Sequence, residues 1–189
     1  VTTYLDMPNT LPQTTTQAAF EEKLSIAAEK SFVNYGFFFG ATCDNLETLQ
    51  CLNKRKVCGV KLFMGSSTGG MLVDEESTLQ KIFEQSRLPI VTHCEDSAII
   101  ADNMRQLQQE LGVKDPEVKY HSKIRSEEAC YKSTQLAVKL AQNCGARLHV
   151  AHISTAKELE LFSAENPNIT AEVCLPHLLY TEADYSRLG

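Results

Sequence analysis

Six apolar, β-rich segments alternate with six segments of helical periodicity, and this alternation restricts the possible folds more than any other feature of the chain. The predicted strands are 3–7, 32–40, 57–64, 89–93, 148–153 and 169–175. The predicted helices are 14–29, 44–53, 75–87, 96–111, 126–143 and 155–164. The strands are too apolar to have one face in water. We therefore expect a parallel sheet covered by helices, in one domain over residues 1–189.

An open doubly wound sheet and a closed (β/α) barrel both satisfy this alternation. A dinucleotide-binding sheet would carry GxGxxG after an early strand, and the sequence contains no such motif. The run GSSTGG at 65–70 follows a strand but lacks the GK[ST] ending of a phosphate loop, so we interpret it as a loop that shapes the mouth of an active site. The polar segment 105–125 is predicted to be an excursion between the strands 89–93 and 148–153.

The composition excludes several classes of protein. Lys and Arg number 18 against 24 Asp and Glu, and the net charge of −6 argues against nucleic acid or an anionic membrane as the main partner. No run of about 18 apolar residues is present, so no membrane-spanning helix is predicted. The seven cysteines form no CxxC pair, and several lie in apolar segments as reduced thiols do, so we expect a cytoplasmic protein.

Polar side chains that can carry out chemistry lie at the carboxyl ends of several predicted strands. Lys61 lies within GVKLFM, His93 and His152 come at the ends of two later strands, and Asn9 follows the first strand. Ligand sites of parallel α/β folds form at this end of the sheet. His177 follows the last predicted strand and is as well suited to line a loop as to bind a ligand.

The alternation of side chains along a strand predicts which residues share the inner face of a barrel. If His152 points into the barrel, Leu148 and Val150 point inward with it, and His149 points outward among the helices. The same rule places Lys61 on the inner face.

A lysine inside an apolar strand requires an explanation. Burial disfavours its ammonium form, so Lys61 can be an ion-pair partner, a Schiff-base nucleophile or an amine that takes up carbon dioxide to form a carbamate. The alternative is that it extends its ammonium group into water at the strand end. A carbamate is an anionic ligand with two oxygens. Together with the imidazoles of His93 and His152 it would supply the three protein ligands of a catalytic zinc site.

Several stretches, in order along nearly the whole chain, resemble the dihydroorotases, which form part of the cyclic amidohydrolase branch of the amidohydrolase superfamily. They are MPNT at 7–10, GVKLFMGSSTG at 59–69, VTHCE at 91–95, YHSKIRSEEAC at 120–130, VAHIST at 150–155, and AEV leading to HLL over 171–179.

The resemblance implies a (β/α)8 TIM-type barrel that holds two zinc ions and catalyses the reversible cyclisation of N-carbamoyl-L-aspartate to dihydroorotate in pyrimidine biosynthesis. Lys61 matches the carbamylated lysine that bridges the two metals and is the predicted catalytic residue. His93 and His152 match the histidines that hold one metal, and Asn9 matches a contact to the substrate carboxylate. The resemblance also implies a homodimer and an association with aspartate carbamoyltransferase.

Two parts of the family pattern have no counterpart in the chain. The HxH pair of the first barrel strand and its neighbouring arginine are absent, and so is the aspartate of the eighth strand. We therefore expect these residues to be strands two to seven of eight, an incomplete barrel truncated at both ends.

Two other functions stay open at this point. A dihydropyrimidinase or an allantoinase would carry the same lysine and histidines, although Asn9 favours an acidic substrate. A non-catalytic, dihydroorotase-like scaffold for aspartate carbamoyltransferase would be expected to have lost metal ligands, and this chain keeps Lys61, His93 and His152. Composition and periodicity alone support only an α/β domain.

Overall fold

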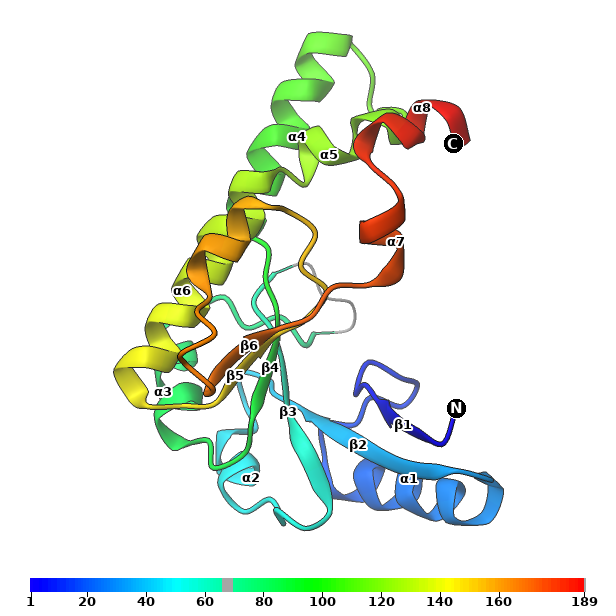
Figure 1. The fold of residues 1–189 in the computed structure, drawn as a ribbon, viewed down its shortest axis with the longest axis vertical. Coiled ribbons are helices and arrows are strands. Elements are labelled where there is room, and N and C mark those ends of the chain that lie inside the picture. The colour runs from blue at the N-terminus through cyan, green and yellow to red at the C-terminus, as the bar shows by residue number, and fades with distance from the viewer. Residues whose placement is uncertain (66–69, 189) are drawn as a thin grey trace.

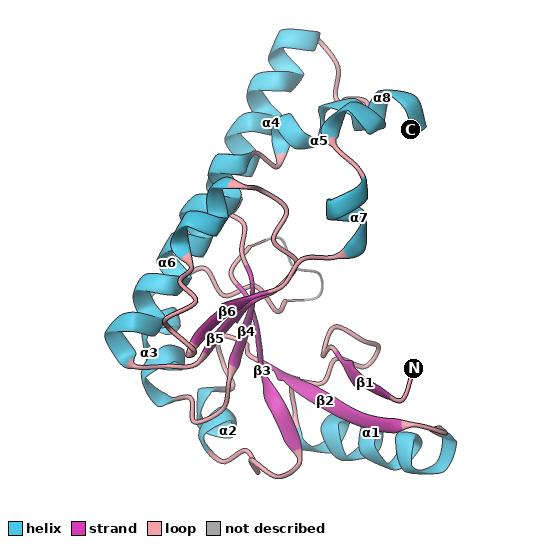
Figure 2. Ribbon diagram, viewed as in Figure 1, coloured by secondary structure: helices cyan, strands magenta, loops and turns pink. Residues whose placement is uncertain are grey.

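The computed structural model describes residues 1–65 and 70–188, and in this part of the chain six strands form one parallel sheet (Figures 1 and 2). The strands are β1 (Thr3–Asp6), β2 (Asn34–Gly40), β3 (Val57–Phe63), β4 (Ile90–His93), β5 (Leu148–Val150) and β6 (Ile169–Ala171). Neighbours in the sheet follow the chain order β1-β2-β3-β4-β5-β6, and each pair is parallel.

This strand order decides between the two folds that the sequence left open. A doubly wound sheet reverses direction once, so its strand order departs from the chain order. Here every connection moves one place in the same direction, as in a (β/α) barrel, and right-handed crossovers then put the helices on one face. The sheet curls, with α1, α2, α3 and α6 outside it (Figure 1). The predicted fold class, an α/β fold with part of a TIM-type barrel, is confirmed.

The helices agree with the prediction except within the polar segment 105–125, where α5 was not predicted, and toward the C-terminus. They are α1 (Gln17–Lys30), α2 (Leu46–Gln50), α3 (Glu76–Gln85), α4 (Ser97–Leu111), α5 (His121–Ile124), α6 (Glu127–Cys144), α7 (Leu175–Leu179) and α8 (Tyr185–Leu188), with 3-10 turns at Val118–Tyr120, Lys157–Leu161 and Glu182–Asp184. The predicted helix 155–164 is only the turn Lys157–Leu161, because the backbone becomes extended at Phe162. The predicted strand 169–175 ends at Ala171, and α7 begins at Leu175 instead, with Pro176 in its first turn.

Local capping explains why the two long helices near the site begin where they do. The Asp96 carboxylate accepts hydrogen bonds from the N–H groups of Ala98 and Ile99 at the start of α4, both at 3.0 Å. Ser126 caps α6 in the same way by accepting from Ala129. The two caps therefore fix the starts of α4 and α6 close to the carboxyl end of β4.

The main apolar core lies between the sheet and the helices. Val60, Leu62, Ile90, Leu148 and Val150 face it from the strands. Its helical side includes Phe20 of α1, Leu79, Ile82 and Phe83 of α3, and Ala137, Val138 and Ala141 of α6. The opposite face of the sheet carries a much smaller cluster of Phe38, Val91 and Ala151. Polar side chains therefore have room on this second face.

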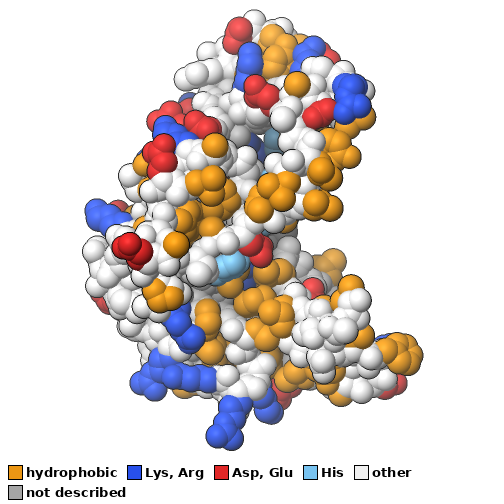
Figure 3. Space-filling view, in the orientation of Figure 1, with side chains coloured by type: hydrophobic (Ala, Val, Ile, Leu, Met, Phe, Trp, Pro, Cys, Tyr) orange, Lys and Arg blue, Asp and Glu red, His pale blue; other side chains and the backbone are white. Residues whose placement is uncertain are grey.

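The C-terminal segment lies apart from the main core. Its apolar side chains Leu175, Leu178, Leu179 and Tyr180 are exposed. Figure 3 shows apolar side chains gathered over this segment and a hollow below it, where a histidine side chain reaches the surface beside an acidic one. None of the helices in the described ranges is long and apolar enough to cross a membrane. All seven cysteines are free thiols.

Candidate metal centre

Two of the predicted ligands meet at the carboxyl end of the sheet. His93 is the last residue of β4, and His152 follows β5 by two residues. Nδ1 of His93 lies 3.1 Å from Nε2 of His152, and the ring centroids are 4.9 Å apart. The two imidazoles therefore face one another with one nitrogen each.

The alternation rule fails at His152, so the predicted assignment of faces on β5 is wrong. Leu148 and Val150 pack into the main core on the helix side, and Ala151 belongs to the cluster on the other face. His149 is on this second face as well, where its ring contacts Thr170 and Glu172 of the neighbouring strand segment. The strand ends at Val150 and His152 takes a φ of 43°, so its side chain is directed by a turn rather than by the pleat.

Lys61 is buried in β3, next to the strand that ends in His93. It is 3% exposed, and its Nζ lies 5.0 Å from the centroid of the Phe63 ring. Burial lowers the pKa of Lys61 to about 8, although the charges of Cys94 and Glu172 act in the opposite direction. The interpretation that the ammonium group extends into water is therefore wrong.

The environment of His152 favours the neutral form of its ring. Burial lowers the pKa of His152, and the charges of His93 and Lys61 lower it further. A neutral imidazole offers one nitrogen lone pair, which is the form that binds metal ions.

Two residues with no predicted role complete this cluster. Oε2 of Glu95 lies 2.8 Å from Nε2 of His93, and the same oxygen is bonded to the guanidinium of Arg125. Burial raises the pKa of Glu95, but the hydrogen bonds and charges of His93 and Arg125 outweigh it, so the net shift is downward. The sequence signal for Glu95 was its place two residues after a strand-end histidine. Arg125 had no comparable position at a strand end, and its signal was its place in the stretch 120–130 that carries the resemblance.

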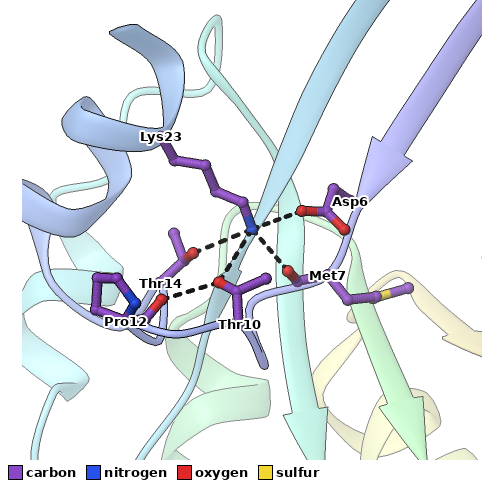
Figure 4. Close-up of polar contacts among 6 residues, drawn as sticks. All are labelled: Asp6, Met7, Thr10, Pro12, Thr14 and Lys23. Atoms are coloured by element: carbon purple, nitrogen blue, oxygen red, sulfur yellow. Dashed lines mark hydrogen bonds and ion pairs between the residues drawn. The ribbon is translucent and has the colours of Figure 1, made fainter. Parts of the chain in front are cut away.

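Asn9 lies in the loop after β1 and is exposed. Lys23 of α1 holds this loop, because its Nζ contacts Asp6 at 2.7 Å and the carbonyl oxygen of Met7 at 2.8 Å, on either side of the strand end (Figure 4). The hydroxyl groups of Thr10 and Thr14 lie within 3.4 Å of the same nitrogen. The loop that carries Asn9 is therefore tied to the first helix by one cation.

His177 contributes to a loop rather than to the histidine pair. Its Nδ1 lies 3.2 Å from the carbonyl oxygen of Ile153, the residue after His152. It lines a cleft of about 790 Å³ together with Glu95, His121 and Arg125. Residues 66–69 of the predicted active-site loop lie outside the described residues.

The arrangement fits a zinc ion at the histidine pair. Two ligands of a tetrahedral zinc with bonds of about 2.0–2.1 Å lie about 3.3 Å from each other, close to the 3.1 Å between the two imidazole nitrogens. In the described ranges no three His, Cys, Asp or Glu side chains gather as a metal site. A carbamate on Lys61 would be a third protein ligand of another kind.

The fold and this cluster define a class: a parallel α/β sheet of barrel type with a histidine pair and a buried lysine at its carboxyl edge. No family model matches the chain. Among curated proteins it is 34% identical to a dihydroorotase of Methanosarcina mazei and 33% identical to one of Methanosphaera stadtmanae, over 100% of this chain and 43% of each relative. It is also 29% identical to an allantoinase of Deinococcus radiodurans, over 100% of this chain and 43% of the relative.

Among solved structures, the L-hydantoinase (dihydropyrimidinase) of Arthrobacter aurescens superposes with a TM-score of 0.91 at 26% identity, over 100% of this chain and 43% of that one. The chain thus spans well under half the length of the proteins it matches. These matches confirm the resemblance to the cyclic amidohydrolase branch, with dihydroorotases among the relatives.

Proposed function

We propose that the protein containing this chain is a dihydroorotase, a zinc-dependent hydrolase that interconverts N-carbamoyl-L-aspartate and dihydroorotate. The observation that carries the proposal is the meeting of Nδ1 of His93 and Nε2 of His152 at 3.1 Å. His93 ends β4, which pairs with the strand β3 that bears the buried Lys61, and His152 follows β5, the next strand in the sheet. Relatives named dihydroorotase, at up to 34% identity, support this substrate over other cyclic amides.

Lys61 would enter the site as a carbamate. The ammonium group first loses a proton. The neutral amine then attacks carbon dioxide, a C–N bond forms as one C–O π bond opens, and the nitrogen releases a second proton, so that a cation becomes an anion. With its pKa lowered to about 8, about a tenth of the Lys61 amine is neutral at pH 7, against about one part in 2,500 for an ordinary lysine. Burial therefore favours the reactive form of this amine.

The other predicted residues would hold the zinc ion and orient the substrate. His93 and His152 would each give one nitrogen to a zinc ion, and the carbamate of Lys61 would bridge it to a second zinc. Zinc bound there would polarise the amide carbonyl and activate water. The amide of Asn9 would donate a hydrogen bond to the substrate carboxylate.

A rate comparison tests the substrate. The full-length protein is assayed with dihydroorotate, dihydrouracil, hydantoin and allantoin under identical conditions. Dihydroorotate should give the highest kcat/KM. A higher value for allantoin or a hydantoin would refute the dihydroorotase assignment and favour the other relatives, which include an allantoinase and an L-hydantoinase.

Zinc content tests the metal site and the non-catalytic alternative. Lys61→Ala should abolish activity and lower the number of zinc ions bound, whereas Lys56→Ala, in the exposed turn before β3, should leave both unchanged. A wild-type protein that binds no zinc and turns over no cyclic amide would support the scaffold for aspartate carbamoyltransferase. The homodimer, the cytoplasmic location, and the placement of residues 1–189 as one barrel domain truncated at both ends stay predictions.

A further inference from the structure

We propose that Glu95 and Arg125 are positioning residues that set the tautomer and orientation of the His93 ring, so that its Nδ1 lone pair is directed at the site shared with His152. The inference rests on the proposed function, since it gives the pair a task toward the zinc ion that the histidines would hold. Its basis is one atom: Oε2 of Glu95 is bonded both to Nε2 of His93, at 2.8 Å, and to the guanidinium of Arg125.

The Glu95 carboxylate decides which nitrogen of His93 carries the proton. An ionised carboxylate only accepts hydrogen bonds, so Nε2 must donate, and a neutral ring then keeps its lone pair on Nδ1. Nδ1 is the nitrogen that faces His152. Metal-binding histidines commonly donate their other ring N–H to a carboxylate, which fixes the ring and strengthens the ligand.

Arg125 in turn keeps the Glu95 carboxylate charged and in place. Glu95 is only 7% exposed, and an ionised group buried to this extent is costly unless a cation pairs with it. The guanidinium is always protonated, so it supplies that charge. Because it bonds the same oxygen as His93, it also limits the movement of the carboxylate away from the ring.

The residues on both sides of Arg125 are held from α4. Nδ2 of Asn103 donates to the carbonyl oxygen of Ile124 at 3.0 Å and to Oγ of Ser126 at 3.2 Å. The N–H of Asp96, next to Glu95, donates to the carbonyl oxygen of Ala129 in the first turn of α6 at 3.0 Å. The polar segment 105–125 therefore places the Arg125 cation against the carboxylate that contacts His93.

The first test measures zinc affinity in the full-length protein by competition with a chromophoric chelator. Glu95→Leu should weaken zinc binding about 10- to 100-fold, the usual effect of removing the partner of a metal-binding histidine. Arg125→Gln should weaken it less, and the double variant should be no weaker than Glu95→Leu alone, because Arg125 acts through Glu95. The control Glu117→Gln, at an exposed carboxylate paired with Lys119, should stay within about twofold of wild type.

The second test reads the tautomer without metal. Two-bond ¹⁵N–¹H NMR of the zinc-free protein should find the His93 proton on Nε2 in wild type and in Glu95→Gln, which keeps an acceptor oxygen, and a mixture of tautomers in Glu95→Leu. A wild-type proton on Nδ1, or an unchanged zinc affinity in Glu95→Leu, would overturn the inference. A wild-type protein that binds no zinc would instead remove the proposed function, and the NMR result would still decide whether Glu95 sets the ring.

Discussion

The segment after His152 is held by a buried carboxylate, and Thr134→Val tests how much this contributes to stability. Glu158 is 3% exposed, and its two oxygens accept hydrogen bonds from Oγ1 of Thr134 at 2.7 Å and Oγ1 of Thr155 at 2.8 Å. Thr134 is fully buried in α6. Valine keeps its shape and removes only the hydroxyl group, so Oε1 of Glu158 loses its donor.

The expected loss in free energy of unfolding follows from the charge and the burial of the acceptor. A hydrogen bond to a charged group contributes about 1.5–3 kcal/mol, and a buried oxygen left without a donor cannot turn to water instead. We therefore expect Thr134→Val to lower the free energy of unfolding by about 2–3 kcal/mol. In a domain of this size that corresponds to a Tm lower by about 5–10 °C.

Urea denaturation followed by circular dichroism gives the free energy of unfolding for each variant. Thr134→Val/Glu158→Met should lose less than Thr134→Val alone, since it removes the unpaired acceptor together with its donor. Thr78→Val is the matched control, because it removes a hydroxyl group that donates to the exposed carboxylate of Glu75, and it should leave the midpoint nearly unchanged. A loss below about 0.5 kcal/mol for Thr134→Val would refute the reasoning, because that is the range of an ordinary surface substitution.

Three further predictions follow from contacts around the site. Asp96→Ala should cost about 1 kcal/mol through loss of the α4 cap. Burial raises the pKa of Asp96, but the hydrogen bonds from Lys132 and the α4 backbone outweigh it, so the net shift is downward. In a pH series of unfolding, the difference in stability between wild type and Asp96→Ala should therefore disappear as the pH falls below about 4. Lys23→Met should raise KM for dihydroorotate more than it changes kcat, because it frees the loop bearing Asn9 (Figure 4), while Lys30→Met at the exposed end of α1 should not. Gly65→Ala should reduce zinc affinity, because a Cβ at this position would overlap the carbonyl oxygen of Glu95 and lie 2.6 Å from its carbonyl carbon. Unchanged zinc binding would contradict this close approach.

The sequence by itself determined most of the helices and strands up to β5, and it singled out most of the candidate ligands. Apolar runs broken by capped amphipathic segments made the parallel α/β class predictable, because periodicity and capping are local properties. Lys61 stood out as one charge in an apolar strand, and the structure buries it to 3% exposure. His93 could be placed at a strand end from its neighbours alone, since β4 is regular up to that residue.

Only the tertiary structure decided how these elements come together. The barrel-type strand order depends on which strands pair, and alternation in the sequence is the same for a doubly wound sheet. The direction of His152 depends on a φ of 43° beyond the strand end, where the period of two no longer applies. Arg125 reaches Glu95 across 30 residues because Asn103 and the α6 cap fix its backbone in space, and sequence spacing records nothing of such a contact.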